Sequence, residues 1–220
     1  VVARAAVFLD DVFPITDTSH AKATRYSVED GTLKIDGAAL IAPEAFTGYT
    51  GRADAPDTVL LRNNGLHVEL VFDRNHPIGK TTPSGLADIR LESAMSAIID
   101  CEDSVACVDA EDKVLAYANW LGLMQGDLEE TFEKGGKTMT RRLNPDRTYT
   151  APDGSDLTLK GRALLLVRNV GHLMTNPAIL DRDDNEIFEG LMDAMFTVLI
   201  AMHDLKKTSG PRNSVAGSVY

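Results

Sequence analysis

The spacing of hydrophobic positions changes several times along the chain, and the changes predict a mixture of helices and strands. Apolar side chains recur at helical spacing over residues 1–13, just before a proline, so we expect a helix there. Residues 26–35, 58–72 and 148–161 each hold two short apolar runs joined through an Asp-Gly or Asn-Gly pair. Because such pairs favour tight turns, these segments predict three β-hairpins.

Further elements follow from the same patterns. Residues 42–51 are expected to form a loop or a short helix around a proline, and residues 97–101 a short apolar strand. Residues 128–133 predict a helix that ends at two glycines, and residues 138–143 a strand. Residues 186–205 predict a long apolar helix.

The segment from Asp109 to Gln125 predicts a strong helix, with Ser104 or Asp109 as its N-cap. The apolar residues expected on its inner side are Val114, Leu115, Ala118, Trp120 and Leu121.

The run from Ala163 to Val167 is apolar without interruption and stops at Arg168. Such runs are typical of strands in parallel sheets that helices cover on both faces. In these folds the carboxyl end of a strand is where chemistry is placed. A guanidinium there would suit a carboxylate or a developing enolate oxygen. From position alone, the alternative that Arg168 caps a strand and pairs with a surface acid stays open.

The composition excludes some partners. The 220 residues carry a net charge of −11, which argues against nucleic acid and anionic membranes because both attract basic surfaces. We find no apolar run near the ~20 residues of a membrane-spanning helix. The two cysteines, Cys101 and Cys107, form neither a disulfide framework nor a zinc motif. We expect both to be reduced and buried in a cytoplasmic protein.

Several motifs then carry a family resemblance. They are Leu61-Arg-Asn-Asn-Gly-Leu-His-Val-Glu69, Ile99-Asp-Cys-Glu-Asp-Ser-Val-Ala106, Asp109-Ala-Glu-Asp-Lys113, Asn119-Trp-Leu-Gly-Leu123, Asn144-Pro-Asp-Arg-Thr-Tyr-Thr150 and Arg168-Asn-Val-Gly-His-Leu-Met174. In this order they resemble malate synthases of the long bacterial G type. That family condenses acetyl-CoA with glyoxylate and water to malate and CoA, using Mg²⁺, in the glyoxylate cycle. Its members are much longer, so the resemblance implies an internal piece of such an enzyme.

The resemblance also implies a fold class, which is α/β. Residues 1–95 and 126–162 would be the two parts of an accessory, inserted α/β domain with mostly antiparallel strands. Residues 96–125 and 163–220 would be a first and a second partial unit of a (β/α)8 (TIM) barrel, the second with a loose tail after Leu205. Because a barrel closes with eight strands and this chain supplies two, the barrel would be incomplete.

Site residues carry over position by position. The resemblance implies that Arg168 is catalytic and contacts glyoxylate and the enolate oxygen, and that Ser104 and Arg141 bind acetyl-CoA. For Ser104 the alternative is a plain helix cap. Arg142, adjacent to Arg141, would point to the opposite face of a strand, so a shift of one position stays open. His172 could transfer protons, but we favour a structural role for it.

The resemblance implies that the Mg²⁺ ligands and the catalytic base lie outside this chain, so we expect no metal ligand here and no turnover by the chain alone. The acids Asp100, Glu102 and Asp103 are then expected to support the barrel mouth. The acidic segment 181–186 lacks the glycine and distal glutamate of an EF-hand loop, and we expect it to lead, solvated, into a helix.

Two alternatives from other classes stay open: a non-catalytic interaction or assembly module, and an acidic metal-binding domain. The parent enzyme is expected to be a monomer. Exposed barrel helices favour self-association of the isolated chain.

Overall fold

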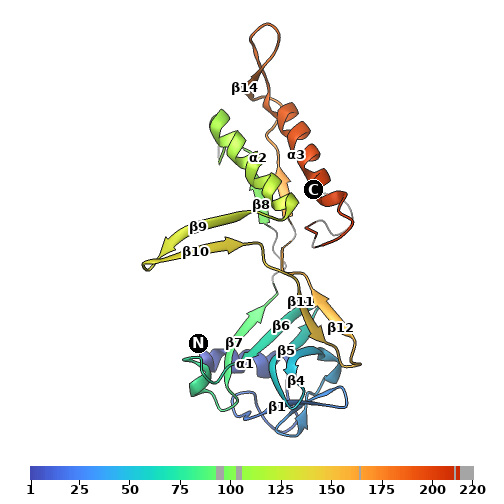
Figure 1. Cartoon of the computed structure of the whole chain (residues 1–220). Helices are drawn as coiled ribbons and strands as arrows, with labels where there is room; N and C mark the ends of the chain where they lie inside the picture. The colour runs from blue at the N-terminus through green and yellow to red at the C-terminus, as the bar shows by residue number, and fades with distance from the viewer. Residues whose placement is uncertain (93–96, 103–105, 164, 211, 214–220) are drawn as a thin grey trace. The chain divides into compact units, whose positions relative to one another are not determined.

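The structure is a computed structural model that describes residues 1–92, 97–102, 106–163, 165–210 and 212–213. It divides into two compact units (Figure 1). Unit 1 comprises Val1–Ala94 and Arg147–Leu159, and unit 2 comprises Met95–Asp146 and Lys160–Tyr220. The assignment of residues 126–162 to an accessory domain stays a prediction. Mixed helices and mostly antiparallel strands, as expected for the fold class, are confirmed.

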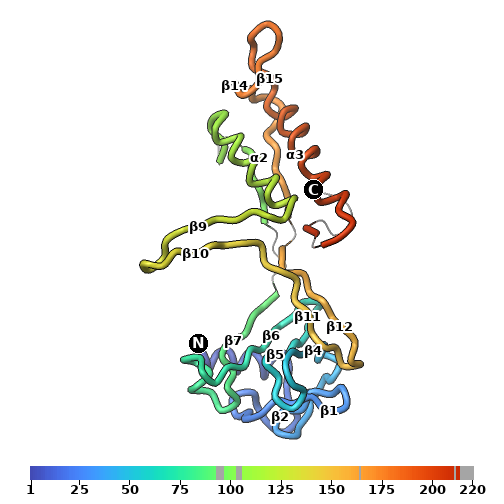
Figure 2. Tube along the Cα trace, in the orientation of Figure 1, coloured from blue at the N-terminus to red at the C-terminus, as the bar shows by residue number. Residues whose placement is uncertain are grey.

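Unit 1 is built around a six-stranded antiparallel sheet in the order β12-β11-β4-β5-β6-β7, with a separate three-stranded sheet β1-β2-β3 whose strand β1 contacts β5. Its elements are α1 (Val2–Val12), β1 (Tyr26–Glu29), β2 (Thr32–Ile35), β3 (Ala38–Ala39), η1 (Pro43–Ala45), β4 (Phe46–Arg52), β5 (Ala55–Asn63), β6 (Leu66–Phe72), η2 (Gly79–Thr81), β7 (Leu86–Leu91), β11 (Arg147–Thr150) and β12 (Asp156–Leu159). Figure 2 shows the β11–β12 hairpin beside β4, which it joins through the pairing of Thr150 with Tyr49.

Local sequence explains most of unit 1. The predicted helix at the start of the chain is confirmed; Leu9 within it and Phe13 just after its end are buried. All three predicted hairpins are confirmed. Asp30 and Gly31 both take positive φ angles, of 47° and 73°, as the two central residues of a type I′ turn must.

One segment of unit 1 differs from its prediction. Residues 46–52 form the strand β4 rather than a loop, and only residues 43–45 are helical. The segment pairs with β5, Tyr49 opposite Val59, and buries Phe46 in the core. Its two glycines and two threonines gave little local signal, so the pairing with β5 decides the structure.

In the part of unit 2 that the structure describes, two helices combine with three two-stranded sheets. Its elements are β8 (Ala97–Asp100), α2 (Ala110–Gln125), β9 (Glu129–Lys134), β10 (Lys137–Arg142), β13 (Leu165–Arg168), β14 (Thr175–Leu180), β15 (Glu186–Phe188) and α3 (Glu189–Leu205). The pair β8 and β13 is parallel, whereas β9–β10 and β14–β15 are antiparallel hairpins. Within the described residues no helix is long and apolar enough to span a bilayer.

Helix α2 begins and ends as its sequence predicts. The Asp109 carboxylate accepts a hydrogen bond from the Asp112 amide at 2.9 Å, and Gly126 ends the helix with φ of 88°. The predicted inner side is only partly correct, because Trp120 is buried whereas Val114 and Leu115 are 63% and 60% exposed. Lys113, which the prediction did not place on the inner side, is buried.

In unit 2 one further prediction is wrong, and the prediction for residues 181–186 is correct in their exposure to solvent but not in a direct lead into a helix. Residues 128–133 do not form a helix: Glu129–Lys134 is the strand β9, and its hairpin partner β10 fixes it through ladder pairing. The segment 181–186 closes the β14–β15 hairpin, where the Asp181 carboxylate accepts the amides of Asp183 and Asn185. The predicted long helix therefore starts three residues later than expected, at Glu189.

Candidate active site at two parallel strand ends

The parallel strands β8 and β13 bring two charged residues together at their carboxyl ends. The register pairs Leu165 with Ala97 at one end and Arg168 with Asp100 at the other. Ile99 and Val167 pack against the helix cluster around Trp120 and Ile200. Since side chains alternate along a strand, Asp100 lies on the face turned away from the helices.

Arg168 and Asp100 form a bidentate ion pair. Arg168 donates from Nε to Oδ1 of Asp100 at 2.8 Å and from Nη2 to Oδ2 at 2.6 Å. This bonding holds the pKa of Asp100 below its ordinary value and raises the pKa of Arg168. The side chain of Arg168 remains 52% exposed. The pair therefore fixes the direction of the guanidinium while much of its surface stays open to a ligand.

The structure only partly decides whether Arg168 is a binding group at a strand end or a strand cap paired with a surface acid. The arginine does pair with an acid, as the capping interpretation expected, but this acid ends the neighbouring parallel strand. Strand ends of this kind are where parallel α/β folds place chemistry. The pairing thus fits a positioned binding group as well as a strand cap.

The backbone just beyond both strand ends is held by buried charges. Lys113 from α2 and Asp193 from α3 are both fully buried. Lys113 Nζ donates to both oxygens of Asp193, at 3.0 and 3.2 Å, and to the carbonyl of Cys101. Asp193 also accepts the amide of Val170 at 2.8 Å and the hydroxyl of Tyr117.

Electrostatics in this cluster follow from burial. Glu189 places a second carboxylate 2.6 Å from Lys113 Nζ. Burial alone would lower the pKa of Lys113, but its bonds to Glu189 and Asp193 outweigh burial and raise that pKa, so the ammonium persists. Burial and the hydrogen bond to Asp193 raise the pKa of Tyr117, which keeps its hydroxyl protonated as a donor.

Sequence reasoning missed this cluster because it treated α2 and α3 as amphipathic or apolar. One signal was present: Asp193 is a lone acid inside the apolar run Gly190-Leu-Met-Asp-Ala-Met-Phe196. An acid in such a run is costly to bury unless it is paired.

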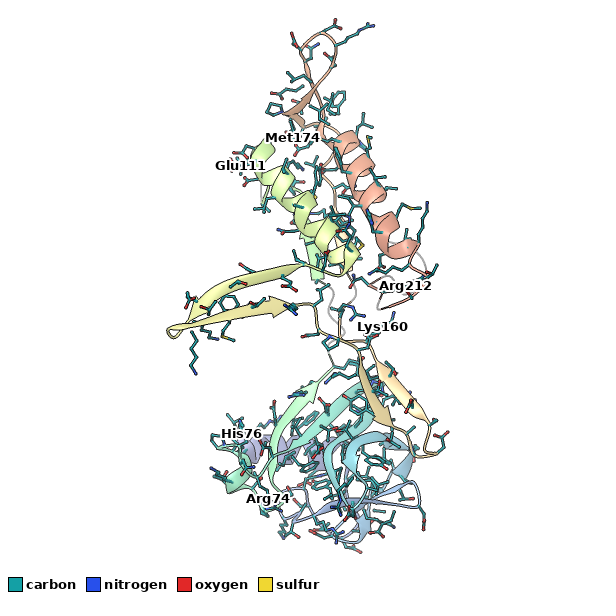
Figure 3. All side chains as sticks on the ribbon, viewed as in Figure 1. Arg74, His76, Glu111, Lys160, Met174 and Arg212 are labelled. Carbon is teal, nitrogen blue, oxygen red and sulfur yellow. The ribbon has the colours of Figure 1, made fainter. Side chains whose placement is uncertain are left out.

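The first turns of α2 and α3 lie at the same end of unit 2. Figure 3 labels Glu111, in the first turn of α2, and Met174, whose carbonyl accepts the first amide of α3.

Arg141 lies on the separate hairpin β9–β10, where its guanidinium stands 4.7 Å above the ring of Phe132. Arg142 lies on the opposite face and binds Glu129 at 2.8 Å. The two arginines thus occupy opposite faces as expected: each lies opposite a glutamate in the register, Glu130 for Arg141 and Glu129 for Arg142, and the ion pair joins Arg142 to Glu129. The roles of both stay predictions.

The other predicted residues fall in different places. Ser104 and Asp103 lie outside the described residues. Glu102 is described, and its amide donates to Oδ1 of Asp100 at 3.1 Å. His172 lies exposed in the turn between β13 and β14. Among the described residues, no three His, Cys, Asp or Glu side chains gather as a metal site.

Comparison with known proteins places these motifs in context. Residues 1–63 match the family model described as malate synthase G, alpha-beta insertion domain. Malate synthase G of Halalkalibacterium halodurans is 51% identical over 225 residues, covering 100% of this chain and 31% of the relative. Malate synthases G of Corynebacterium efficiens and Corynebacterium glutamicum are 50% and 49% identical, each over 97% of this chain and 29% of the relative. The chain thus spans about a third of the length of these relatives.

Proposed function

Because this chain is homologous along its whole length to part of malate synthase G, we propose that it forms part of an acyltransferase that condenses acetyl-CoA with glyoxylate and water to malate and CoA. The single observation that carries the proposal is the Arg168 guanidinium, held by Asp100 at the end of a parallel strand pair. The resemblance found from motifs alone is confirmed by the identities over the whole chain.

The reaction sets the roles of the residues. Carbon–carbon bond formation needs a base that removes a methyl proton of acetyl-CoA and positive charge that holds the enolate and aldehyde oxygens. Arg168 supplies positive charge in a planar fork. Asp100 is poorly suited as the base, since both of its oxygens bind Arg168 and its pKa is held low. As the family resemblance implies, we expect the base to come from another part of the enzyme.

Acetyl-CoA would be bound at Arg141 and Ser104. The exposed cation–π pair of Arg141 with Phe132 offers a flat, cationic surface suited to phosphate or to the adenine ring. On the opposite face of β10, Arg142 is bound to Glu129. The two adjacent arginines therefore make a matched pair of variants for testing coenzyme binding.

Magnesium is part of the proposed parent reaction, but the described residues do not fit a magnesium site. No three potential ligands converge there, and the carboxylate of Asp100 is committed to Arg168. We therefore derive no step through the metal from this chain.

The fold proposal is that β8–α2 and β13–α3 are early units of a (β/α)8 barrel and unit 1 an inserted domain. Parallel pairing, helices on one face and Arg168 at the carboxyl end support it. Ile98 supports it as well: it is 56% exposed on the face away from the helices, where a closed barrel would bury it. A cytoplasmic location belongs to the same proposal and is supported by the free, buried cysteines Cys101 and Cys107.

The function is tested with the complete natural protein that carries this chain. When the purified protein is incubated with Mg²⁺ and acetyl-CoA, it should release CoA thiol and form malate only after glyoxylate is added. The 220-residue chain alone should show no turnover. In calorimetry with acetyl-CoA, Arg141→Met should weaken binding by about tenfold, the value of one lost charge-assisted contact, whereas Arg142→Met should not. If the complete protein releases no CoA thiol in response to glyoxylate, the proposed function is refuted. If the two variants weaken acetyl-CoA binding equally, the role of Arg141 is refuted.

An assembly module remains a second candidate because α3 carries an exposed apolar stripe. Leu191, Met195, Val198 and Leu199 are each about 60% exposed, at helical spacing. Within a complete barrel a neighbouring helix would cover the stripe. Substitutions in the complete protein decide between the candidates: a non-catalytic module of a larger enzyme predicts a protein partner and no change in acetyl-CoA binding or turnover in Arg141→Met and Arg168→Lys.

A further inference from the structure

We propose that Asp193, acting with Lys113, is a positioning residue for the Arg168 guanidinium. The proposal rests on the proposed function, since it concerns the geometry of that active site. It adds a buried pair on the two helices that neither the motifs nor the comparisons assign to the site.

The first step of the argument is that the pair grips the backbone beyond both strands. Asp193 accepts the amide of Val170, two residues after Arg168. Lys113 donates to the carbonyl of Cys101, one residue after Asp100. One buried ion pair therefore holds the two backbones that carry the two halves of the Arg168–Asp100 pair.

The second step is that these contacts form a closed ring. The amide of Cys101 donates to the carbonyl of Arg168 at 2.9 Å. The ring runs from Asp193 to Val170, through Arg168 to Cys101, and through Lys113 back to Asp193. A shift of one strand end relative to the other would break at least one of its bonds. The ring thus fixes the register at the point where the two charged side chains leave the backbone.

The third step is energetic. Lys113 and Asp193 have no exposed surface, so they meet no solvent that could replace a lost partner. Two further residues surround the pair. A Glu189 carboxylate oxygen lies 2.6 Å from Lys113 Nζ, and the Tyr117 hydroxyl donates a hydrogen bond to Asp193. Since no water can replace a lost partner, a buried polar network favours one arrangement of the groups it binds. An active site gains from this because small displacements of a binding group are costly to the rate.

The test compares Asp193→Asn with Asp204→Asn in the complete protein. Asp204 is the matched control: it is equally buried on the same helix, but it accepts the amide of Asn213, away from the strand ends. We expect Asp193→Asn to lower kcat by ~10- to 100-fold with the KM for acetyl-CoA unchanged, because a misplaced binding group costs rate. Asp204→Asn should leave kcat within twofold of the wild type even where it lowers Tm.

Two further measurements keep the test decisive. If Asp193→Asn does not fold, Tyr117→Phe removes one bond to Asp193 and should lower kcat by a smaller factor, again with KM unchanged. In the complete protein, the Arg168 Nε–H signal in nitrogen-15 NMR should exchange more slowly in the wild type and in Asp204→Asn than in Asp193→Asn.

The outcomes separate the two proposals. Equal kcat for the two Asn variants, or equal exchange of the Arg168 Nε–H in both, overturns the positioning role. A complete wild-type protein that forms no malate overturns the proposed function instead. The exchange measurement then still decides whether Asp193 orients Arg168.

Discussion

Unit 1 contains a buried carboxylate whose removal should destabilise that unit alone. Glu69 on β6 is 4% exposed. It accepts the hydroxyl of Tyr149 at 2.6 Å and the guanidinium groups of Arg147 and Arg90 at 2.6 and 3.2 Å. Tyr149 and Arg147 belong to β11, so the contacts of Glu69 join the segment 147–159, which is distant in the sequence, to the sheet.

The expected cost of Glu69→Ala follows from these contacts. The lost hydrogen bond from the buried Tyr149 hydroxyl to a charged group is worth ~1.5–3 kcal/mol. The two arginine side chains are 54% and 42% exposed, so each lost ion pair adds ~0–1 kcal/mol. We expect a total loss of ~1.5–5 kcal/mol, which shifts a urea midpoint by ~1–2.5 M at an m-value of ~2 kcal/mol/M.

The assay uses the one tryptophan of the chain. Trp120 lies fully buried in unit 2, so its fluorescence follows the unfolding of unit 2, whereas far-ultraviolet circular dichroism also follows the strands of unit 1. In urea, Glu69→Ala should lower the midpoint seen by dichroism and leave the fluorescence midpoint unchanged. Tyr149→Phe should produce a smaller shift. Asp54→Ala, which removes an exposed ion pair with Arg52, should produce none.

Two results would refute this reasoning. An unchanged dichroism midpoint in Glu69→Ala would mean that the buried carboxylate does not hold β11 in place. An equal shift of the fluorescence midpoint would mean that the two units do not unfold separately.

Three further predictions concern other groups. Burial lowers the pKa of His20, whose Nε2 donates to the Phe13 carbonyl. The contribution of neutral His20 to the stability of unit 1 should therefore be complete above pH 6.5 and fall as the pH drops toward the lowered pKa. Urea midpoints measured from pH 8 to 5 check this, and His20→Gln should make the midpoint depend less on pH. Burial and the nearby Asp193 raise the pKa of Cys101 to about 12, so native Cys101 should react with a thiol reagent at pH 8 at least tenfold more slowly than in urea; fast native reaction would contradict the burial. The exposed apolar stripe on α3 should make the isolated chain self-associate, and Leu191→Lys should shift its sedimentation toward the monomer. Identical sedimentation of the wild-type chain and Leu191→Lys would exclude the stripe as the site of self-association.

The sequence predicted the elements whose signal is local. The Asp30-Gly31 turn and the Asp109 cap were identified because a few adjacent residues determine each structure. The strand end at Arg168 was identified because an apolar run meets a charge there. In each case the deciding contacts lie within a few positions in the chain.

The remaining features depend on partners far away in the sequence. The segment 129–134 is a strand only because β10 pairs with it. Lys113 is buried because Asp193, 80 residues later, neutralises it, and by pattern alone a lysine is assigned to solvent. From the sequence, Asp100 is only one of three acids expected to support the barrel mouth. Its position opposite Arg168 follows from the register of strand pairing, which the sequence does not show.

The most direct test of the account is the catalytic rate of the complete protein with Arg168→Lys. Lysine keeps the charge but loses the planar fork that binds Asp100 through two nitrogens. The account predicts that glyoxylate-dependent malate formation falls by ~100-fold or more in kcat, whereas Arg182→Lys, a change at a 92% exposed arginine on the β14–β15 turn, leaves kcat unchanged. An Arg168→Lys enzyme as fast as the wild type would contradict the placement of the active site at this strand end.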